Sequence, residues 1–129
     1  MPSLRFVHTG AMSAVMNMAI DDILLDAARQ GAGPILRTYE WRPPAVSIGY
    51  AQRVEDAVDV DRCRALGIDL VRRTTGGRAV LHWNELTYSF HCADGEGPAA
   101  HPVQEASRIL GECLADGLRR FGVDASLER

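Results

Sequence analysis

The sequence predicts an α+β fold. Its predicted elements run in the order strand, helix, several strands, helix and strand, which differs from the strict alternation of a parallel doubly wound sheet. Hydrophobic residues make up 47% of the 129 positions and charged residues 24%, values that are ordinary for a globular protein. This length is that of one ordinary domain, and we therefore expect residues 1–129 to belong to a single domain.

Residues 4–8 are predicted to form a short strand that leads into a long helix. Ser13 can cap this helix, and apolar residues then recur at helical spacing through about Ala28. These apolar residues are Met16, Ile20, Ile23, Leu24 and Ala27. Because glycine ends helices readily, we expect Gly31 and Gly33 to end this one.

Two strand candidates, residues 34–41 and 45–49, flank the break at Arg42-Pro43-Pro44. Proline can neither continue a helix nor pair in a central strand, so a hairpin-like turn is expected there. A short helix follows over residues 59–66, and residues 68–73 form an extended apolar run that ends in two arginines. The two arginines are therefore placed at a strand end.

A second hairpin is expected from residues 78–83 and 86–92, because the side chains of Asn84 and Glu85 suit a tight connection between them. Both of these strand candidates follow the pair of arginines closely in the sequence. Together with the first hairpin, they supply most of the expected strands.

Residues 102–121 are predicted to form an amphipathic helix, which Gly122 closes. The apolar residues at helical spacing are Val103, Ala106, Ile109, Leu110, Cys113, Leu114 and Leu118. Residues 123–127 are expected to begin one further strand. A strand that starts so near the last residue indicates an interrupted fold.

Charge and composition argue against several classes of function. A net charge of −3 and a pI near 5.7 give no electrostatic footprint for nucleic acid or for an anionic membrane. No apolar run reaches the roughly 18 residues of a membrane span, and the first residues lack the basic-then-apolar order of a signal peptide. The cysteines are odd in number and widely spaced: Cys63, Cys92 and Cys113. This indicates free thiols in a reducing compartment. Each cysteine is also expected to be a small core residue. We expect a cytoplasmic protein that binds neither nucleic acid nor membrane.

Two kinds of chemistry lack their residues. All 14 basic residues are arginine, so this chain cannot complete a mechanism that needs a lysine side chain. His91, Cys92 and His101 do not lie at standard zinc spacing, and no fourth ligand is evident. We therefore expect no metal site.

The segment from Arg72 to His82 reads Arg-Arg-Thr-Thr-Gly-Gly-Arg-Ala-Val-Leu-His and carries the most informative chemistry. Glycine lets the backbone approach a ligand closely and direct consecutive amides at an anion or a polarised carbonyl, and arginine adds planar charged donors. This combination suits an acyl or acyl-phosphate group. On local pattern alone, however, a simple hairpin turn at Gly76-Gly77 between solvated arginines is the favoured interpretation.

Three motifs together resemble the superfamily of biotin/lipoate protein ligases and octanoyl/lipoyl transferases. The segment of residues 72–82 resembles the superfamily's acyl-pocket signature. Residues 16–22, Met-Asn-Met-Ala-Ile-Asp-Asp, resemble its first-helix motif, and residues 46–52, Val-Ser-Ile-Gly-Tyr-Ala-Gln, resemble its pocket-facing strand and loop. The resemblance implies a mixed, largely antiparallel sheet with flanking helices, as in the biotin/lipoate ligase catalytic domain, of which residues 1–129 would be an N-terminal portion.

Within this superfamily, Tyr50 and Arg78 resemble LipM-type octanoyltransferases, because lipoate ligases typically have an arginine and a glycine at these positions. This resemblance implies transfer of an octanoyl or lipoyl group to a lysine of lipoyl carrier domains through a cysteine thioester. In that branch the nucleophilic cysteine and its lysine lie downstream of the long helix. No catalytic residue is therefore assigned here, and both residues are expected beyond the chain end.

The resemblance assigns substrate binding to ten residues. They are Tyr50, Arg72, Arg73, Thr75, Gly76, Gly77, Arg78, Ala79, Val80 and His82. Arg72 and Arg73 would position polar groups of the ligand, the glycine turn would supply donors, and His82 would border the reacting carbonyl. Without the resemblance, a structural histidine bonded within a hairpin is an equally good interpretation of His82.

The resemblance also implies partners. They are an octanoyl or lipoyl group and lipoyl carrier domains such as the glycine-cleavage H protein or a 2-oxoacid dehydrogenase E2. The transferase interpretation needs no cofactor. Two alternatives stay open: an ATP-dependent lipoate-protein ligase, which would need ATP and Mg²⁺, and a non-catalytic acyl-binding fragment.

Overall fold

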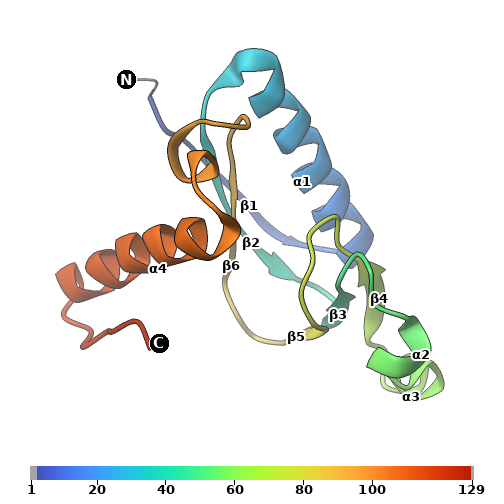
Figure 1. Cartoon of the computed structure of the whole chain (residues 1–129). Helices are drawn as coiled ribbons and strands as arrows, with labels where there is room; N and C mark the ends of the chain where they lie inside the picture. The colour runs from blue at the N-terminus through green and yellow to red at the C-terminus, as the bar shows by residue number, and fades with distance from the viewer. Residues whose placement is uncertain (1–2, 129) are drawn as a thin grey trace. The chain divides into compact units, whose positions relative to one another are not determined.

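The structure is a computed structural model that describes residues 3–128, and it divides into two compact units at the bond between His91 and Cys92. The first unit contains two three-stranded sheets, and helix α1 (Ala14–Ala27) packs against strands of both (Figure 1). One sheet has the order β1-β2-β6, formed by Arg5–Met12, Ile35–Trp41 and Thr87–His91. The other has the order β4-β3-β5, formed by Asp69–Arg72, Ala45–Ile48 and Val80–His82.

The predicted α+β class and the mixed sheet type are confirmed. Strand β2 pairs in parallel with β1 and antiparallel with β6, and β3 pairs in parallel with β4 and antiparallel with β5. Over the part of the chain that the structure describes, parallel and antiparallel pairs are thus equal in number. The expected antiparallel majority is not found, because both sheets place a parallel neighbour beside their central strand.

Neither predicted hairpin forms. Strands β2 and β3 belong to different sheets, because both edges of β2 are occupied by β1 and β6 and no edge is free for β3. Likewise β5 pairs with β3 whereas β6 pairs with β2, so residues 83–86 carry the chain from one sheet to the other. The tight connection itself is present: Asn84 has a φ of 49°, a left-handed conformation that asparagine adopts more readily than most residues.

Two helices of the first unit, α1 and α3, follow their sequence signals. The Ser13 side chain caps α1 by accepting a hydrogen bond from the Met16 amide at 3.3 Å. A π-helical turn, η1 (Ala28–Ala32), follows, and Gly33 ends it with a φ of 79°. The predicted short helix is α3 (Val60–Ala65), which Asp59 caps. A further short helix, α2 (Val54–Ala57), was not predicted.

The interior between α1 and the β1-β2-β6 sheet contains a buried ion pair. The guanidinium of Arg37 is fully buried and donates to the Asp21 carboxylate at 2.8 Å and to the Asn17 side-chain oxygen at 2.7 Å. Tyr39 and Ser89 donate to the same carboxylate at 3.0 and 2.7 Å. The helix therefore directs two polar residues, Asn17 and Asp21, toward the sheet.

This arrangement changes the pKa of Asp21. Burial by itself would raise the pKa, but hydrogen bonds from His91, Ser89 and Arg37 and the charge of Arg37 outweigh it, so the pKa lies below the ordinary value of 3.8. The apolar repeat predicted along this helix is only partly buried, since Met16 is 51% exposed. Hydrogen bonds and the buried ion pair therefore contribute much of the attachment of α1 to the sheet.

The second unit consists of the 3-10 turn η2 (Gly97–Ala100) and helix α4 (Val103–Arg120), with Gly122 at a φ of 82° after it, as predicted. The strand expected over residues 123–127 does not form. Those residues have no strand beside them in this unit, and Leu127 packs on Gly111 of α4 instead. In the described chain no helix is long and apolar enough to cross a membrane.

The expectation that each cysteine is a core residue is wrong for one of them. Cys113 is exposed on α4, together with its apolar neighbours Leu114 and Leu118. Cys63 and Cys92 are half-buried. All three are free thiols in the structure.

Replacing Asp21 by alanine should lower the free energy of unfolding by about 3–5 kcal/mol, because it leaves the buried Arg37 guanidinium without its counter-charge. Asp22, the next residue, is exposed and provides a matched control. Asp22→Ala should change the stability by less than about 0.5 kcal/mol. Urea unfolding followed by circular dichroism measures both variants, and equal stabilities would contradict the structural role of the buried pair.

Stability should also fall in acid through Asp21. Because its pKa is lower in the folded chain than in the unfolded chain, the unfolded chain binds more protons between the two values. The contribution of Asp21 is therefore complete above its ordinary pKa of 3.8 and is lost as the pH falls through the lower folded value. Thermal unfolding from about pH 2 to 6 should show a flatter profile for Asp21→Asn than for the wild type. Parallel profiles would show that Asp21 is not a source of this pH dependence.

Candidate functional site

The segment predicted to bind substrate folds as the end of β4, a loop over residues 73–79 and the short strand β5. We call residues 73–79 the glycine loop. Because β4 and β5 lie on either side of β3, the loop must cross the end of β3 to connect them. It therefore lies beside residues 49–52, the turn that follows β3.

The guanidinium of Arg73 joins the glycine loop to β3. Its Nη1 atom donates to the backbone oxygen and the hydroxyl of Ser47 at 2.8 and 2.7 Å. Its Nη2 atom donates to the backbone oxygens of Gly76 and Arg78 at 3.0 and 2.9 Å. The side chain is thus bonded to four protein acceptors, and it fixes the loop from within.

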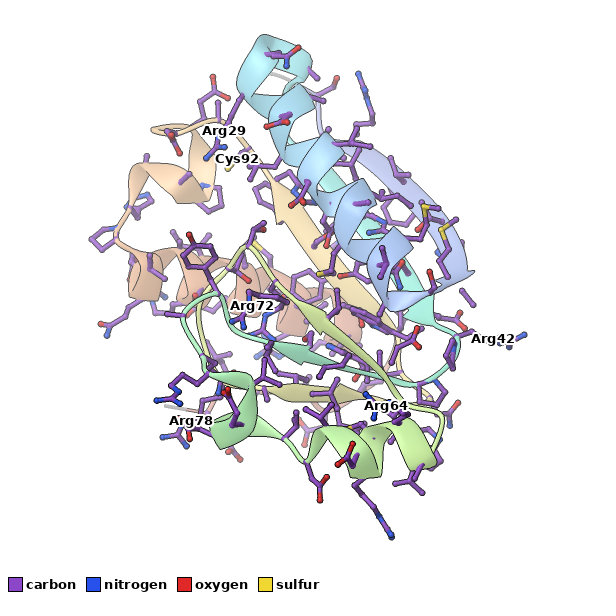
Figure 2. The ribbon with its side chains drawn as sticks, turned by 90° about the vertical axis from the view of Figure 1, so that its right-hand side faces the viewer. Arg29, Arg42, Arg64, Arg72, Arg78 and Cys92 are labelled. Atoms are coloured by element: carbon purple, nitrogen blue, oxygen red, sulfur yellow. The ribbon has the colours of Figure 1, made fainter. Side chains whose placement is uncertain are left out.

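Arg72 has a similar role toward the neighbouring turn. Its Nη1 atom lies 2.9, 3.0 and 2.7 Å from the backbone oxygens of Gly49, Tyr50 and Gln52. Arg78, in contrast, is exposed, and among residues 3–128 no carboxylate forms an ion pair with it. Figure 2 labels both side chains and shows Arg72 among the backbone segments and Arg78 on the outside of the ribbon.

Gly49 is required by the close approach of the glycine loop. A Cβ atom at this position would lie 2.0 Å from the backbone oxygen of Gly77, so no other residue fits without movement of the loop. Gly77 itself has a φ of 94°, a conformation that favours glycine. The adjacent Tyr50 amide donates to the backbone oxygen of Thr75 at 3.0 Å. Gly49 lies within the motif at residues 46–52 but was not among the ten predicted binding residues.

Four consecutive backbone oxygens of the loop, those of residues 75–78, are therefore directed at protein groups. The intervening peptide bonds are trans, and in a trans peptide the N–H of the next residue points opposite to the C=O. The amides of residues 76–79 must then point away from the groups that bind the loop. Within the described chain none of these four amides donates a hydrogen bond. The loop presents a row of free donors.

His82 lies below this loop and is buried, with 7% of its surface exposed. Its Nε2 atom is 2.7 Å from the Ser47 hydroxyl, its Nδ1 atom is 2.6 Å from a Glu85 carboxylate oxygen, and its ring stacks on Trp41 at 4.0 Å between centroids. Both ring nitrogens are thus occupied by protein groups. This geometry corresponds to the structural interpretation that the sequence had left open.

The pKa of Glu85 reflects these contacts. Partial burial would raise it, but hydrogen bonds from Thr87 and His82 outweigh burial and lower the pKa below the ordinary 4.5. Glu85 is then an ionised acceptor, which requires the Nδ1 atom of His82 to carry the proton. The Nε2 atom is bonded to the Ser47 hydroxyl.

Ser47, His82 and Glu85 have the connectivity of a nucleophile, a base and an orienting acid. However, Ser47 is fully buried, and its oxygen also accepts a hydrogen bond from Arg73. A substrate carbonyl cannot reach it. Sequence reasoning missed Ser47 and Glu85, and the available signals were weak: a hydroxyl in an apolar strand and an acid three residues after the histidine.

The other predicted binding residues gather around the same loop. Tyr50 is 69% exposed and Val80 45% exposed, Thr75 and Gly76 are exposed, and Ala79 is half-buried. A cleft of ≈ 530 Å³ lies elsewhere, between residues 40–44 and 83–86, and none of the ten predicted residues lines it. No group of three or more metal-binding side chains occurs among residues 3–128.

Comparison with known proteins identifies the family. The model of the lipoyl protein ligase A/B catalytic domain matches residues 13–129. An octanoyltransferase LipM of Kyrpidia tusciae is 44% identical over 130 residues, which are 100% of this chain and 47% of that protein. An octanoyltransferase LipM of Clostridioides difficile is 42% identical over 121 residues, which are 93% of this chain and 45% of that protein. The chain spans about half the length of these relatives.

Solved structures agree with the sequence relatives. A putative lipoate protein ligase from Thermoplasma acidophilum has a TM-score of 0.82 and 31% identity, and a lipoate-protein ligase A bound with ATP has a TM-score of 0.80 and 30% identity. Each comparison covers 97% of this chain and 51% of the other. The superfamily predicted from three sequence motifs is confirmed. Because the family model covers most of its length and the fold agrees, the chain belongs to the lipoyl protein ligase A/B catalytic domain family.

Proposed function

We propose that this chain is the acyl-binding part of an enzyme that transfers an octanoyl or lipoyl group to a lysine of a lipoyl carrier domain, through a cysteine thioester. The row of free amides at residues 76–79 carries the proposal, because such donors suit an acyl carboxylate or the carbonyl of a thioester. Relatives 42–44% identical to this chain are named octanoyltransferases, which supports the octanoyl group as substrate.

The site works by a fixed arrangement of donors. Because Arg73 and Gly49 already hold the loop, its amides need little reorganisation when a carbonyl binds or gains negative charge. The exposed guanidinium of Arg78 adds a positive charge beside them. We assign ligand contacts to Tyr50, Thr75, Gly76, Gly77, Arg78, Ala79 and Val80, where the side chains of Tyr50 and Val80 offer exposed apolar surface to the acyl chain.

Three of the predicted binding residues act through the loop. Arg72 and Arg73 hold the turn and the loop by their backbone oxygens, and His82 lies below them with both nitrogens bonded. The chain contains no lysine. We infer that the nucleophilic cysteine and the lysine of the reaction belong to a part of the enzyme outside these 129 residues.

A second candidate is an ATP-dependent lipoate-protein ligase. It is favoured by structures of about the same fold and 30–31% identity that are named lipoate protein ligases, one of them bound with ATP. The same amide row would suit a phosphate. One ligase of this fold was studied with its E2 lipoyl domain, and we propose such a domain as the carrier in either reaction. Titration with magnesium ATP separates the candidates, because only the ligase requires the nucleotide to bind.

Octanoate should bind this chain more tightly than octan-1-ol does, by at least about tenfold, because hydrogen bonds to a charged group contribute about 1.5–3 kcal/mol. The two ligands have carbon chains of equal length and differ in the polar group, which is a carboxylate in one and a hydroxyl in the other. Isothermal titration calorimetry measures both affinities, and amide chemical shifts locate the bound ligand. Equal affinities, or shifts confined to residues outside 75–80, would contradict the proposed role of the glycine loop.

A further inference from the structure

We infer that Ser47 and Glu85 are positioning residues of the acyl site, which hold the glycine loop through Arg73 and His82 without touching a ligand. The expected effect on acyl binding rests on the proposed function of the loop. The way in which the loop is held rests on a continuous chain of hydrogen bonds. Neither residue was among the ten assigned to binding.

One half of this chain of hydrogen bonds lies on the side of His82 that faces a carboxylate group. The indole Nε1–H of Trp41 donates to the Thr87 hydroxyl at 2.8 Å, and that hydroxyl donates to Glu85 Oε1 at 2.7 Å. His82 donates from Nδ1 to the same oxygen at 2.6 Å. Trp41 belongs to β2 and His82 to β5, so this half of the chain also joins the two sheets.

The other half leads from His82 to the loop. The Ser47 hydroxyl is hydrogen-bonded to His82 Nε2 at 2.7 Å and accepts from Arg73 Nη1 at 2.7 Å. The second amino group of Arg73 then binds the backbone oxygens of Gly76 and Arg78. A change at Ser47 is therefore two bonds away from the loop.

The donors and acceptors at the Glu85 end of this chain of hydrogen bonds match one another. Tryptophan only donates and an ionised glutamate only accepts, so the Thr87 hydroxyl and the Nδ1 atom of His82 both donate to Glu85. The Nε2 atom of His82 is bonded to Ser47, whose oxygen also accepts from Arg73. Every group in this series of hydrogen bonds has its partner, including the groups at the two ends. Removal of one member therefore leaves a neighbouring group without a hydrogen-bond partner.

Burial prevents water from replacing the Ser47 hydroxyl. Ser47 is 0% exposed, and the rings of Trp41 and His82 stack beside it. The loop itself is mostly exposed and has little apolar packing of its own. Its position therefore depends on Arg73, on the Tyr50 amide and on the contact with Gly49.

The test compares two removals of a buried or half-buried serine hydroxyl, Ser47→Ala and Ser89→Ala. Ser89 donates to Asp21 in the Arg37 cluster and does not contact the loop. The reporter is hydrogen exchange of the Tyr50 amide, which is bonded to the Thr75 backbone oxygen in the loop. Ser47→Ala should speed this exchange by about tenfold or more, whereas Ser89→Ala should leave it within about twofold. Equal changes in the two variants would overturn the inference.

A second pair of variants covers the case in which Ser47→Ala does not fold. Glu85 is partly exposed, so its replacement should be tolerated. Glu85→Ala should speed exchange of the Tyr50 amide and broaden or shift the His82 ring nitrogen signals, because Nδ1 loses its acceptor. Glu85→Gln should restore both, since its amide oxygen can accept the same bonds. Failure of glutamine to rescue, or no effect of alanine, would overturn the role of Glu85.

These measurements need no ligand, so they separate the inference from the proposed function. If the wild type does not bind octanoate, the proposed function fails while the exchange of the Tyr50 amide still decides the role of Ser47. If it does bind, Ser47→Ala should weaken octanoate binding by about tenfold and Ser89→Ala by less than about twofold. Equal octanoate affinities for the two variants would show that the loop does not depend on Ser47.

Discussion

The four hydrogen bonds of the Arg73 guanidinium hold the candidate site together. They connect β3 to the glycine loop. Because they turn backbone oxygens of the loop toward the protein, the amides of the loop remain free. A planar group with five fixed donors can bond two segments at once, whereas a lysine ammonium would act as a single point of charge. The arginine that sequence reasoning assigned to the ligand is thus bonded to the protein, and the backbone that it positions faces outward.

The rest of the first unit supports the hydrogen bonds of Arg73 through polar contacts more than through the packing of apolar side chains. The buried apolar cluster is small, formed by Ala14, Tyr39, Trp41 and Ala45. Beside it, the Arg37–Asp21 pair docks α1 on the sheet. The series of side-chain hydrogen bonds that runs from Trp41 to Ser47 joins the two sheets under the loop. Such networks are costly to leave incomplete, which makes the position of each member well defined. A loop that must present fixed donors gains from so rigid a base.

Local signals in the sequence were sufficient for α1 and α3, because Ser13 and Asp59 cap them through residues only three positions away. Strand pairing was not predictable in the same way. Both expected hairpins failed, since the partners of β2 and β3 are chosen by the whole arrangement of strands and not by the turns that follow them. The family could be recognised from residues 16–22, 46–52 and 72–82. The roles within the site could not, because whether His82 faces a ligand or Glu85 depends on a contact that spacing does not reveal.

Hydrogen exchange of the amides of residues 76–79, measured with and without octanoate, tests the central claim most directly. Without ligand these four amides should exchange nearly as fast as in an unfolded chain, while the Tyr50 amide, which is bonded to the loop, should be protected. Saturating octanoate should slow the exchange of the four amides by about tenfold or more. Protection of these amides in the free chain, or no change when octanoate is bound, would contradict the claim that the loop presents them to an acyl group.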